Sequence, residues 1–174
     1  AEQIIGQVIT EKPDLRNKDV LDAMIVGSMV YFHQKEYKKI QSIYAKLQAS
    51  DTWYIKTMGA PWVMNKNLIE ILTHLELENL DYAESRLDSF VIKNKEYLEQ
   101  DERATVYLKY LRISFSHADK VQTEEFQNTF FEAVEKKPRL REDIYVLSFL
   151  AYLKAKMLGE ETYKTTLDLM EIIS

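Results

Sequence analysis

Glycine and proline, the residues that most often end helices and form tight turns, are scarce in this sequence. The chain of 174 residues contains four Gly and three Pro. An all-β sandwich depends on many turns built from these residues, so that class of fold is excluded. Apolar residues recur instead at intervals of three and four residues along almost the whole chain, which is the spacing of an amphipathic helix. The sequence therefore predicts an all-α fold.

The positions of polar caps and breakers divide this pattern into helices. Asn17 is expected to cap one helix, and Asp81 another, with Glu84 completing a capping box. Pro138 and Gly159 separate the helices that follow. We expect one leading helix and eight further helices that form four antiparallel hairpins, at residues 2–11, 18–34, 36–48, 61–77, 82–98, 102–118, 122–136, 141–158 and 160–173.

The stretch YIKTMGAPWVMNKN, residues 54–67, brings a glycine and a proline together. Proline lacks a backbone N–H and has a fixed φ, so it fits the first turn of a helix and disrupts a helix interior. We expect residues 50–60 to form a connection with about one helical turn, and a new helix to begin at Pro61. The flanking Trp53 and Trp62 are expected to anchor this connection on the core. A ligand-facing loop is the alternative.

Composition limits the kind of molecule further. Apolar residues make up 46% and charged residues 29%, which is typical of a globular protein, and we expect residues 1–174 to form a single domain. The leading helix would lack a partner, so the chain is expected to be part of a longer protein. The absence of cysteine fits a reducing compartment such as the cytoplasm. With a net charge of −5 and no apolar run long enough to span a membrane, we expect neither nucleic acid nor membrane as a partner.

Sequence motifs of enzymes are missing. The chain has no nucleophile elbow, phosphate-binding loop, dinucleotide-binding motif or cysteine nucleophile. The nearest arrangement to a metal site is Glu70, His74 and Glu78, which follow one helix face at four-residue spacing. A bound metal would also need ligands from a second helix, so we interpret this row as a polar stripe. We expect no catalytic residue, metal or cofactor.

Helical hairpins recur along the chain. The second helices of the four hairpins begin near Glu36, Asp81, Gln122 and Gly159, at intervals of 45, 41 and 37 residues. This pattern is typical of an α-solenoid. The segments YFHQKEYKKIQSIYAKL and LELENLDYAESRLDSF resemble tetratricopeptide repeats (TPRs), with turns at Lys35–Tyr37 and Leu80–Tyr82. In the third hairpin, family-like spacing is found at Tyr110, Ile113, Ser114, His117, Phe130, Ala133 and Pro138.

This resemblance implies a TPR-like scaffold whose concave surface, lined by the first helix of each hairpin, binds a protein or peptide. Helical spacing places apolar residues on the inner faces of the first and third hairpins, including Leu108, Leu111 and Phe115. The second and fourth hairpins mix polar and aromatic residues there, as peptide recognition requires. The predicted groove residues are Asn67, Glu70, His74, Tyr145 and Tyr152.

Two functions are consistent with such a scaffold. The first is a non-enzymatic protein- or peptide-interaction domain. The alternative is a regulatory domain that senses a ligand or peptide, because some bacterial regulators join a DNA-binding helix-turn-helix to a TPR-like region that binds a signalling peptide.

Overall fold

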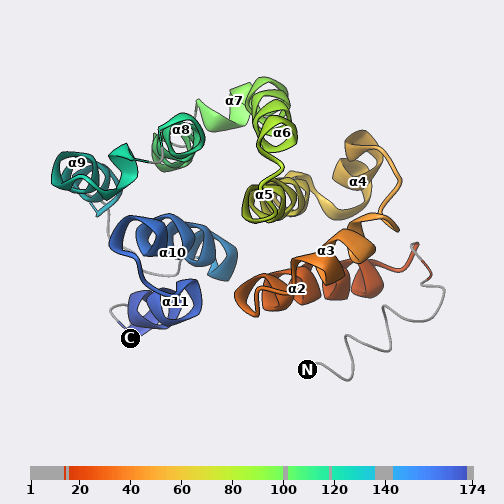
Figure 1. Ribbon diagram of the computed structural model, residues 1–174. Coiled ribbons are helices and arrows are strands. Elements are labelled where there is room, and N and C mark those ends of the chain that lie inside the picture. The colour runs from red at the N-terminus through yellow and green to blue at the C-terminus, as the bar shows by residue number, and fades with distance from the viewer. Residues whose placement is uncertain (1–13, 15, 100–101, 118, 136–142, 172–174) are drawn as a thin grey trace. The chain divides into compact units, whose positions relative to one another are not determined.

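The computed structural model describes residues 14, 16–99, 102–117, 119–135 and 143–171. These residues form ten α-helices and one short 3₁₀-helix, and no strand occurs among them (Figure 1). The all-α prediction is confirmed. The predicted leading helix at 2–11 and the break at Pro138 lie outside the described residues. The helices are α2 (Lys18–His33), α3 (Tyr37–Tyr44), α4 (Asp51–Met58), α5 (Ala60–Glu76), α6 (Leu80–Lys93), α7 (Lys95–Leu98), α8 (Glu102–Ser116), η1 (Lys120–Gln122), α9 (Glu124–Glu135), α10 (Ile144–Leu158) and α11 (Thr162–Glu171).

The chain divides into two compact units, and the boundary between them lies within α6, between Arg86 and Leu87. The first unit contains α2 to α5 and the beginning of α6, and the second contains the end of α6 and the helices that follow. No helix in the described part of the chain is both long and apolar enough to cross a membrane.

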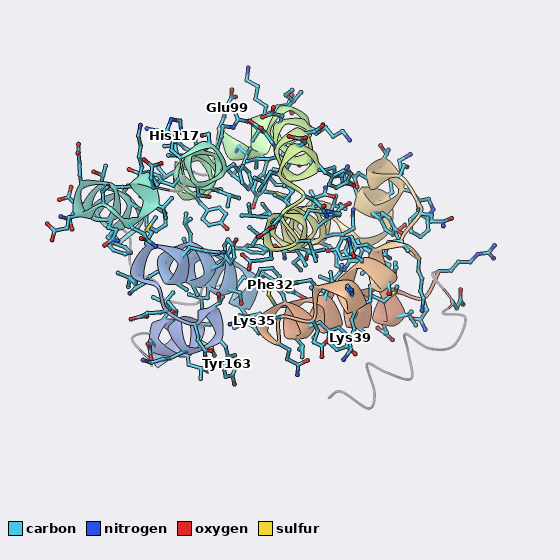
Figure 2. All side chains as sticks on the ribbon, in the orientation of Figure 1. Phe32, Lys35, Lys39, Glu99, His117 and Tyr163 are labelled. Atoms are coloured by element: carbon cyan, nitrogen blue, oxygen red, sulfur yellow. The ribbon has the colours of Figure 1, made fainter. Side chains whose placement is uncertain are left out.

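The core of the first unit forms where α2, α3 and α5 pack against one another. Side chains fill the space between these helices (Figure 2). Asn17 caps α2 as predicted, because its Oδ1 accepts a hydrogen bond of 2.9 Å from the Asp19 N–H. Burial of the apolar residues supplies the main driving force for this packing. They include Leu21, Met24, Ile25, Phe32, Ile40, Ile43, Val63, Ile69 and Leu72.

The stretch that contains Gly59 and Pro61 is a junction between two helices. Gly59 has φ +95° and ψ 160°, a conformation that only glycine adopts readily, and it ends α4. Helix α5 begins at Ala60 with Pro61 in its first turn, so the predicted helix start at Pro61 is correct to within one residue. The preceding segment is more helical than predicted, because α4 covers eight residues and the Ser50 hydroxyl accepts a hydrogen bond from the Trp53 N–H.

The two tryptophans at this junction differ in burial. Trp62 is half-buried, and its ring lies 5.2 Å from the ring of Tyr54, a residue that is fully buried. Trp53 is 38% exposed, although its ring also contacts Tyr54. The predicted anchoring therefore applies to Trp62 more than to Trp53.

In the second unit, α8 packs on α9 and α10 packs on α11. Phe130 of α9 is buried, and its ring lies 5.1 Å from the ring of Tyr110 of α8 in an edge-to-face arrangement. Helix α10 is buried along most of its length, from Leu147 to Ala155. It begins at a side-chain cap from Asp143 and ends at Gly159, which adopts the left-handed conformation as predicted for a tight break.

Two predictions about the region of 81–98 need correction. Helix α6 begins at Leu80, so Asp81 lies in its first turn instead of at the N-cap position. The single helix expected at 82–98 is interrupted at Asn94, which separates α6 from α7. The Asn94 side chain donates a hydrogen bond of 2.8 Å to the Phe90 carbonyl. Asparagine side chains that bond to the local backbone compete with helix continuation, which explains the break.

Candidate functional site

Three of the predicted groove residues, Asn67, Glu70 and His74, lie on α5 in one polar network of the first unit. The Arg86 guanidinium on α6 contacts Glu70 Oε2 at 2.6 Å and Asn67 Oδ1 at 3.3 Å. The Tyr82 hydroxyl donates to Glu70 Oε1 at 3.0 Å. Both carboxylate oxygens of Glu70 are therefore occupied by groups of α6, which limits their availability to a partner.

Asn67 is linked to a buried cation as well. Lys66 is 6% exposed, and its Nζ donates to Asn67 Oδ1 at 2.8 Å. The same Nζ lies 3.4 Å from Asp51 Oδ1, and Asn67 Nδ2 donates to Asp51 Oδ2 at 3.4 Å. A buried charge must be paired and hydrogen-bonded to be tolerated, and these contacts meet that requirement. The network therefore joins α4, α5 and α6.

His74 lies at the outer edge of this network. Its ring is 4.2 Å from the ring of Tyr82, and its Nδ1 lies 3.2 Å from Asn79 Nδ2. The pKa of His74 is lowered, mainly because burial disfavours the charged imidazolium. The negative charge of Glu70 partly opposes this shift, and the positive charge of Arg86 adds a smaller contribution in the same direction as burial. A shallow depression beside the imidazole is lined by His74, Glu78, Asn79, Leu80, Asp81 and Tyr82.

Glu70, His74 and Glu78, which follow one another at four-residue spacing in the sequence, have different surroundings. No cluster of metal-binding side chains occurs among the described residues. Glu70 is bonded to Arg86 and Tyr82, whereas Glu78 is exposed beyond the end of α5 in a left-handed conformation. The interpretation of this row as a polar stripe agrees with these positions.

The two remaining predicted groove residues lie on α10, in the second unit. Tyr145 is half-buried, and Tyr152 is 2% exposed. The Tyr152 ring is enclosed by protein and is not presented to a partner, because α10 is buried on several sides. The structure thus gathers three of the five predicted residues into one network and places the other two on a separate, largely buried helix.

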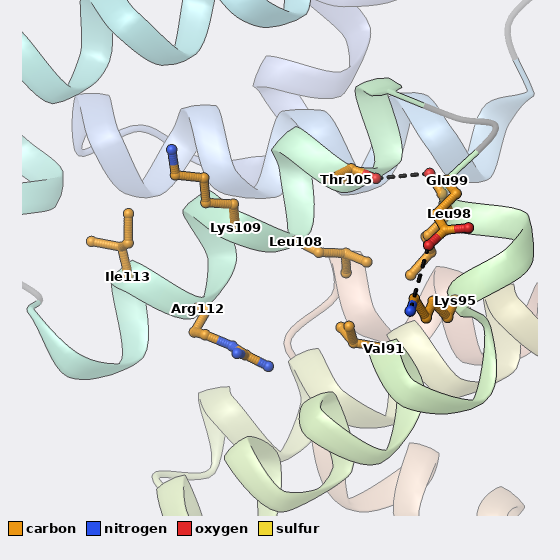
Figure 3. Close-up of a pocket in the computed structure, with 9 residues that line it drawn as sticks. All are labelled: Val91, Lys95, Leu98, Glu99, Thr105, Leu108, Lys109, Arg112 and Ile113. Carbon is orange, nitrogen blue, oxygen red and sulfur yellow. Dashed lines mark hydrogen bonds and ion pairs between the residues drawn. The ribbon is translucent and has the colours of Figure 1, made fainter.

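A groove that the sequence did not predict lies in the second unit between α6, α7 and α8 (Figure 3). It has a volume of about 430 Å³. Its apolar side chains are Val91 and Ile113, which are half-buried, and Leu98 and Leu108, which are buried. Its polar lining consists of Lys95, Glu99, Thr105, Lys109 and Arg112.

The charged residues around this groove are exposed and mostly cationic. Lys95 lies 3.7 Å from Glu99, and Arg112 pairs with Asp88 of α6. Lys109 is exposed and has no ion-pair partner within the described ranges. The lining therefore carries three cations and one anion, although the whole chain has a net charge of −5. The groove combines an apolar floor with a positively charged rim.

The sequence does not predict this groove, because the groove depends on the distances between α6, α7 and α8. The periodicity of apolar residues within each helix does not determine those distances. A partial signal was present in α8, where Thr105, Lys109 and Ile113 follow one another at four-residue spacing beside Leu108. Helical spacing also places Leu108 on the inner face of the third hairpin, but that face lacks the mixture of polar and aromatic residues on which the groove prediction rests. The Thr105 hydroxyl also donates to the Leu98 carbonyl at 2.8 Å and so fixes α7 against α8.

Comparison with known proteins identifies no relative. No protein-family model matches the chain, and no curated protein or solved structure matches it either.

Proposed function

We propose that this chain is a non-enzymatic protein- or peptide-interaction domain built from TPR-like helical hairpins. Consecutive helices pack as pairs in three of the expected hairpins, α2 with α3, α8 with α9 and α10 with α11, which supports a repeated hairpin unit. The turns after α2 and α5 also resemble each other: Lys35 in the first and Glu78 in the second both have positive φ angles near 60°.

The groove between α6, α7 and α8 is the proposed binding site for the protein or peptide. Interaction sites commonly combine an apolar centre with a polar, solvent-accessible rim. Val91, Leu108 and Ile113 provide the apolar centre, and exposed Lys95 and Lys109 contribute to the rim. The volume of about 430 Å³ falls within the usual range for sites that enclose part of a ligand.

The polar network of the first unit is assigned a different role. Its hydrogen bonds occupy Asn67, Glu70 and Lys66 within the protein. Satisfied buried networks hold helices in one arrangement, so we propose that this network positions α4, α5 and α6. His74, at the edge of the network, is half-buried.

The proposal can be tested by selecting binders from a random peptide library displayed on phage, with the full chain as the target. The selected peptides are then synthesised, and their affinities are measured by fluorescence anisotropy. The double substitution Val91→Asp and Ile113→Asp should weaken their binding at least about tenfold, or about 1.4 kcal/mol. The control is Ile92→Asp, because Ile92 is on α6 but is 76% exposed and does not line the groove.

Circular dichroism of each variant checks that the helices are retained. Failure to select any peptide, or equal binding by the wild type and the groove variant, would contradict the proposed function.

A further inference from the structure

We infer that the groove between α6, α7 and α8 binds an acidic amphipathic helix. The apolar face of that helix would contact Val91, Leu108 and Ile113, and its carboxylates would pair with Lys109, Lys95 and Arg112. This inference rests on the proposed function, since it specifies the class of peptide that the same groove recognises.

The walls of the groove favour a helical ligand over an extended one. All three walls are helices, whose interior backbone N–H and C=O groups bond within the helix. An extended peptide normally pairs its backbone with a sheet edge, and no strand occurs in the described residues. The lining also contains no Asn or Gln that could bond to a peptide backbone. A helix satisfies its own backbone and so enters such a groove at lower cost.

The arrangement of side chains in the groove suits an apolar helix face. Val91 of α6 faces Leu108 of α8 across the groove, as Figure 3 shows. Thr105, Lys109 and Ile113 form a row at four-residue spacing along α8. Helices pack when the ridge of one enters the groove formed by rows of this kind. Apolar side chains of the ligand, at three- and four-residue spacing, would cover the floor between Val91, Leu108 and Ile113.

The charge of the rim selects for acidic residues on the ligand. Lys109 has no ion-pair partner in the described part of the chain, so a carboxylate could approach it without displacing an existing contact. Arg112 is paired with Asp88, and Lys95 with Glu99, but all four side chains are at least half exposed. Exposed pairs of this kind are weak and can exchange partners. A basic ligand would instead place a cation beside Lys109, whose charge is not offset by an anion in the described part of the chain.

The test uses four synthetic peptides of equal length, measured by fluorescence anisotropy against the full chain. The first is an amphipathic Leu/Glu helix. The second replaces every Glu with Lys, the third replaces every Glu with Gln, and the fourth scrambles the first so that Leu no longer lies on one face. Among the three amphipathic peptides, the Leu/Glu peptide should bind most tightly and the Leu/Lys peptide least tightly. The affinity of the Leu/Gln peptide should lie between them. The scrambled peptide should not bind. Added salt should weaken the Leu/Glu complex in particular.

Substitutions in the chain link this order of affinities to the groove. Lys109→Glu should weaken Leu/Glu binding at least about tenfold and strengthen Leu/Lys binding. Lys120→Glu is the matched control, because it makes the same change of charge at an exposed residue that does not line the groove. Val91→Gln should weaken binding of the Leu/Glu peptide, whereas Ile92→Gln should not.

The outcomes separate this inference from the proposed function. If the Leu/Lys peptide binds as tightly as the Leu/Glu peptide, or if the scrambled peptide binds more tightly than the Leu/Glu peptide, the inference of an acidic amphipathic ligand is wrong. The proposal that the groove binds a peptide would still stand. If sedimentation shows a dimer that Val91→Gln dissociates, the occupant is a second copy of the chain, and the inference is wrong. Selection of no library peptide together with no binding of the four peptides would contradict both.

Discussion

Arg86 of α6 and Glu70 of α5 form an ion pair of 2.6 Å that is partly shielded from solvent, with side chains 28% and 14% exposed. A second ion pair, between Arg112 and Asp88, lies at the surface, and its side chains are 50% and 52% exposed. The two pairs have the same chemistry in different surroundings. Burial strengthens the first interaction and also increases the cost of leaving one of its members without a partner.

Arg86→Gln should lower the free energy of unfolding by about 1–3 kcal/mol, because the partly buried Glu70 side chain would lose its ion-pair partner. Asp88→Asn, in the exposed pair, should lower it by less than about 1 kcal/mol. Chemical denaturation followed by circular dichroism measures both changes. Equal effects of the two substitutions would show that the network around Glu70 is not a stabilising element.

The junction between α4 and α5 should respond differently to two neighbouring substitutions. Gly59→Ala should destabilise the protein by about 1–3 kcal/mol, because φ +95° with ψ 160° is strained for any residue with a Cβ. The added atom would meet only Pro61 Cδ at 3.8 Å, so the backbone and not a clash is the cause. Pro61→Ala should change stability by less than about 1 kcal/mol, because a first-turn proline replaces no helix hydrogen bond. Thermal melting of both variants tests this contrast.

Phe130→Ala should lower the free energy of unfolding by about 3–5 kcal/mol, since it leaves a cavity beside Tyr110 in the second unit. Ile92→Ala, at a side chain that is 76% exposed, should have an effect within about 0.5 kcal/mol. Denaturant titration with a helical signal compares the two. A loss below about 1 kcal/mol for Phe130→Ala would contradict its position in the core.

Stability should fall as the solution is acidified below about pH 6.5. Burial lowers the pKa values of His33 and His74 from 6.5, so the unfolded chain binds protons more readily than the folded chain. This contribution is fully present above pH 6.5 and is lost as the pH falls through the folded-state pKa values.

The pH dependence can be measured with the double variant His33→Gln and His74→Phe, which removes both titrating groups and keeps a ring beside Tyr82. Its denaturation midpoint should change less than that of the wild type between about pH 7.5 and about pH 5.5. An identical dependence in both proteins would exclude these two imidazoles as its source.

Local features of the sequence determined the fold class and most helix positions. The periodicity of apolar residues acts through hydrogen bonds and burial within each helix, so it predicted α2, α5, α8, α9, α10 and α11 to within a few residues. Gly59 and Pro61 also act on their own backbone, which is why the junction between α4 and α5 was predictable. The break at Asn94 was missed because a side-chain bond to Phe90 competes there with a favourable helical pattern.

Contacts between helices were decided only by the tertiary structure. Asn67 and Glu70 were predicted to line a groove, but Arg86 and Asp51, distant in sequence, bind their side chains. Tyr152 was also predicted to line it, yet it is buried, because helical spacing defines a face without showing what covers that face. The groove beside Lys109 depends on the separation of α6, α7 and α8. That separation results from how side chains of all three helices pack, which no single helix specifies.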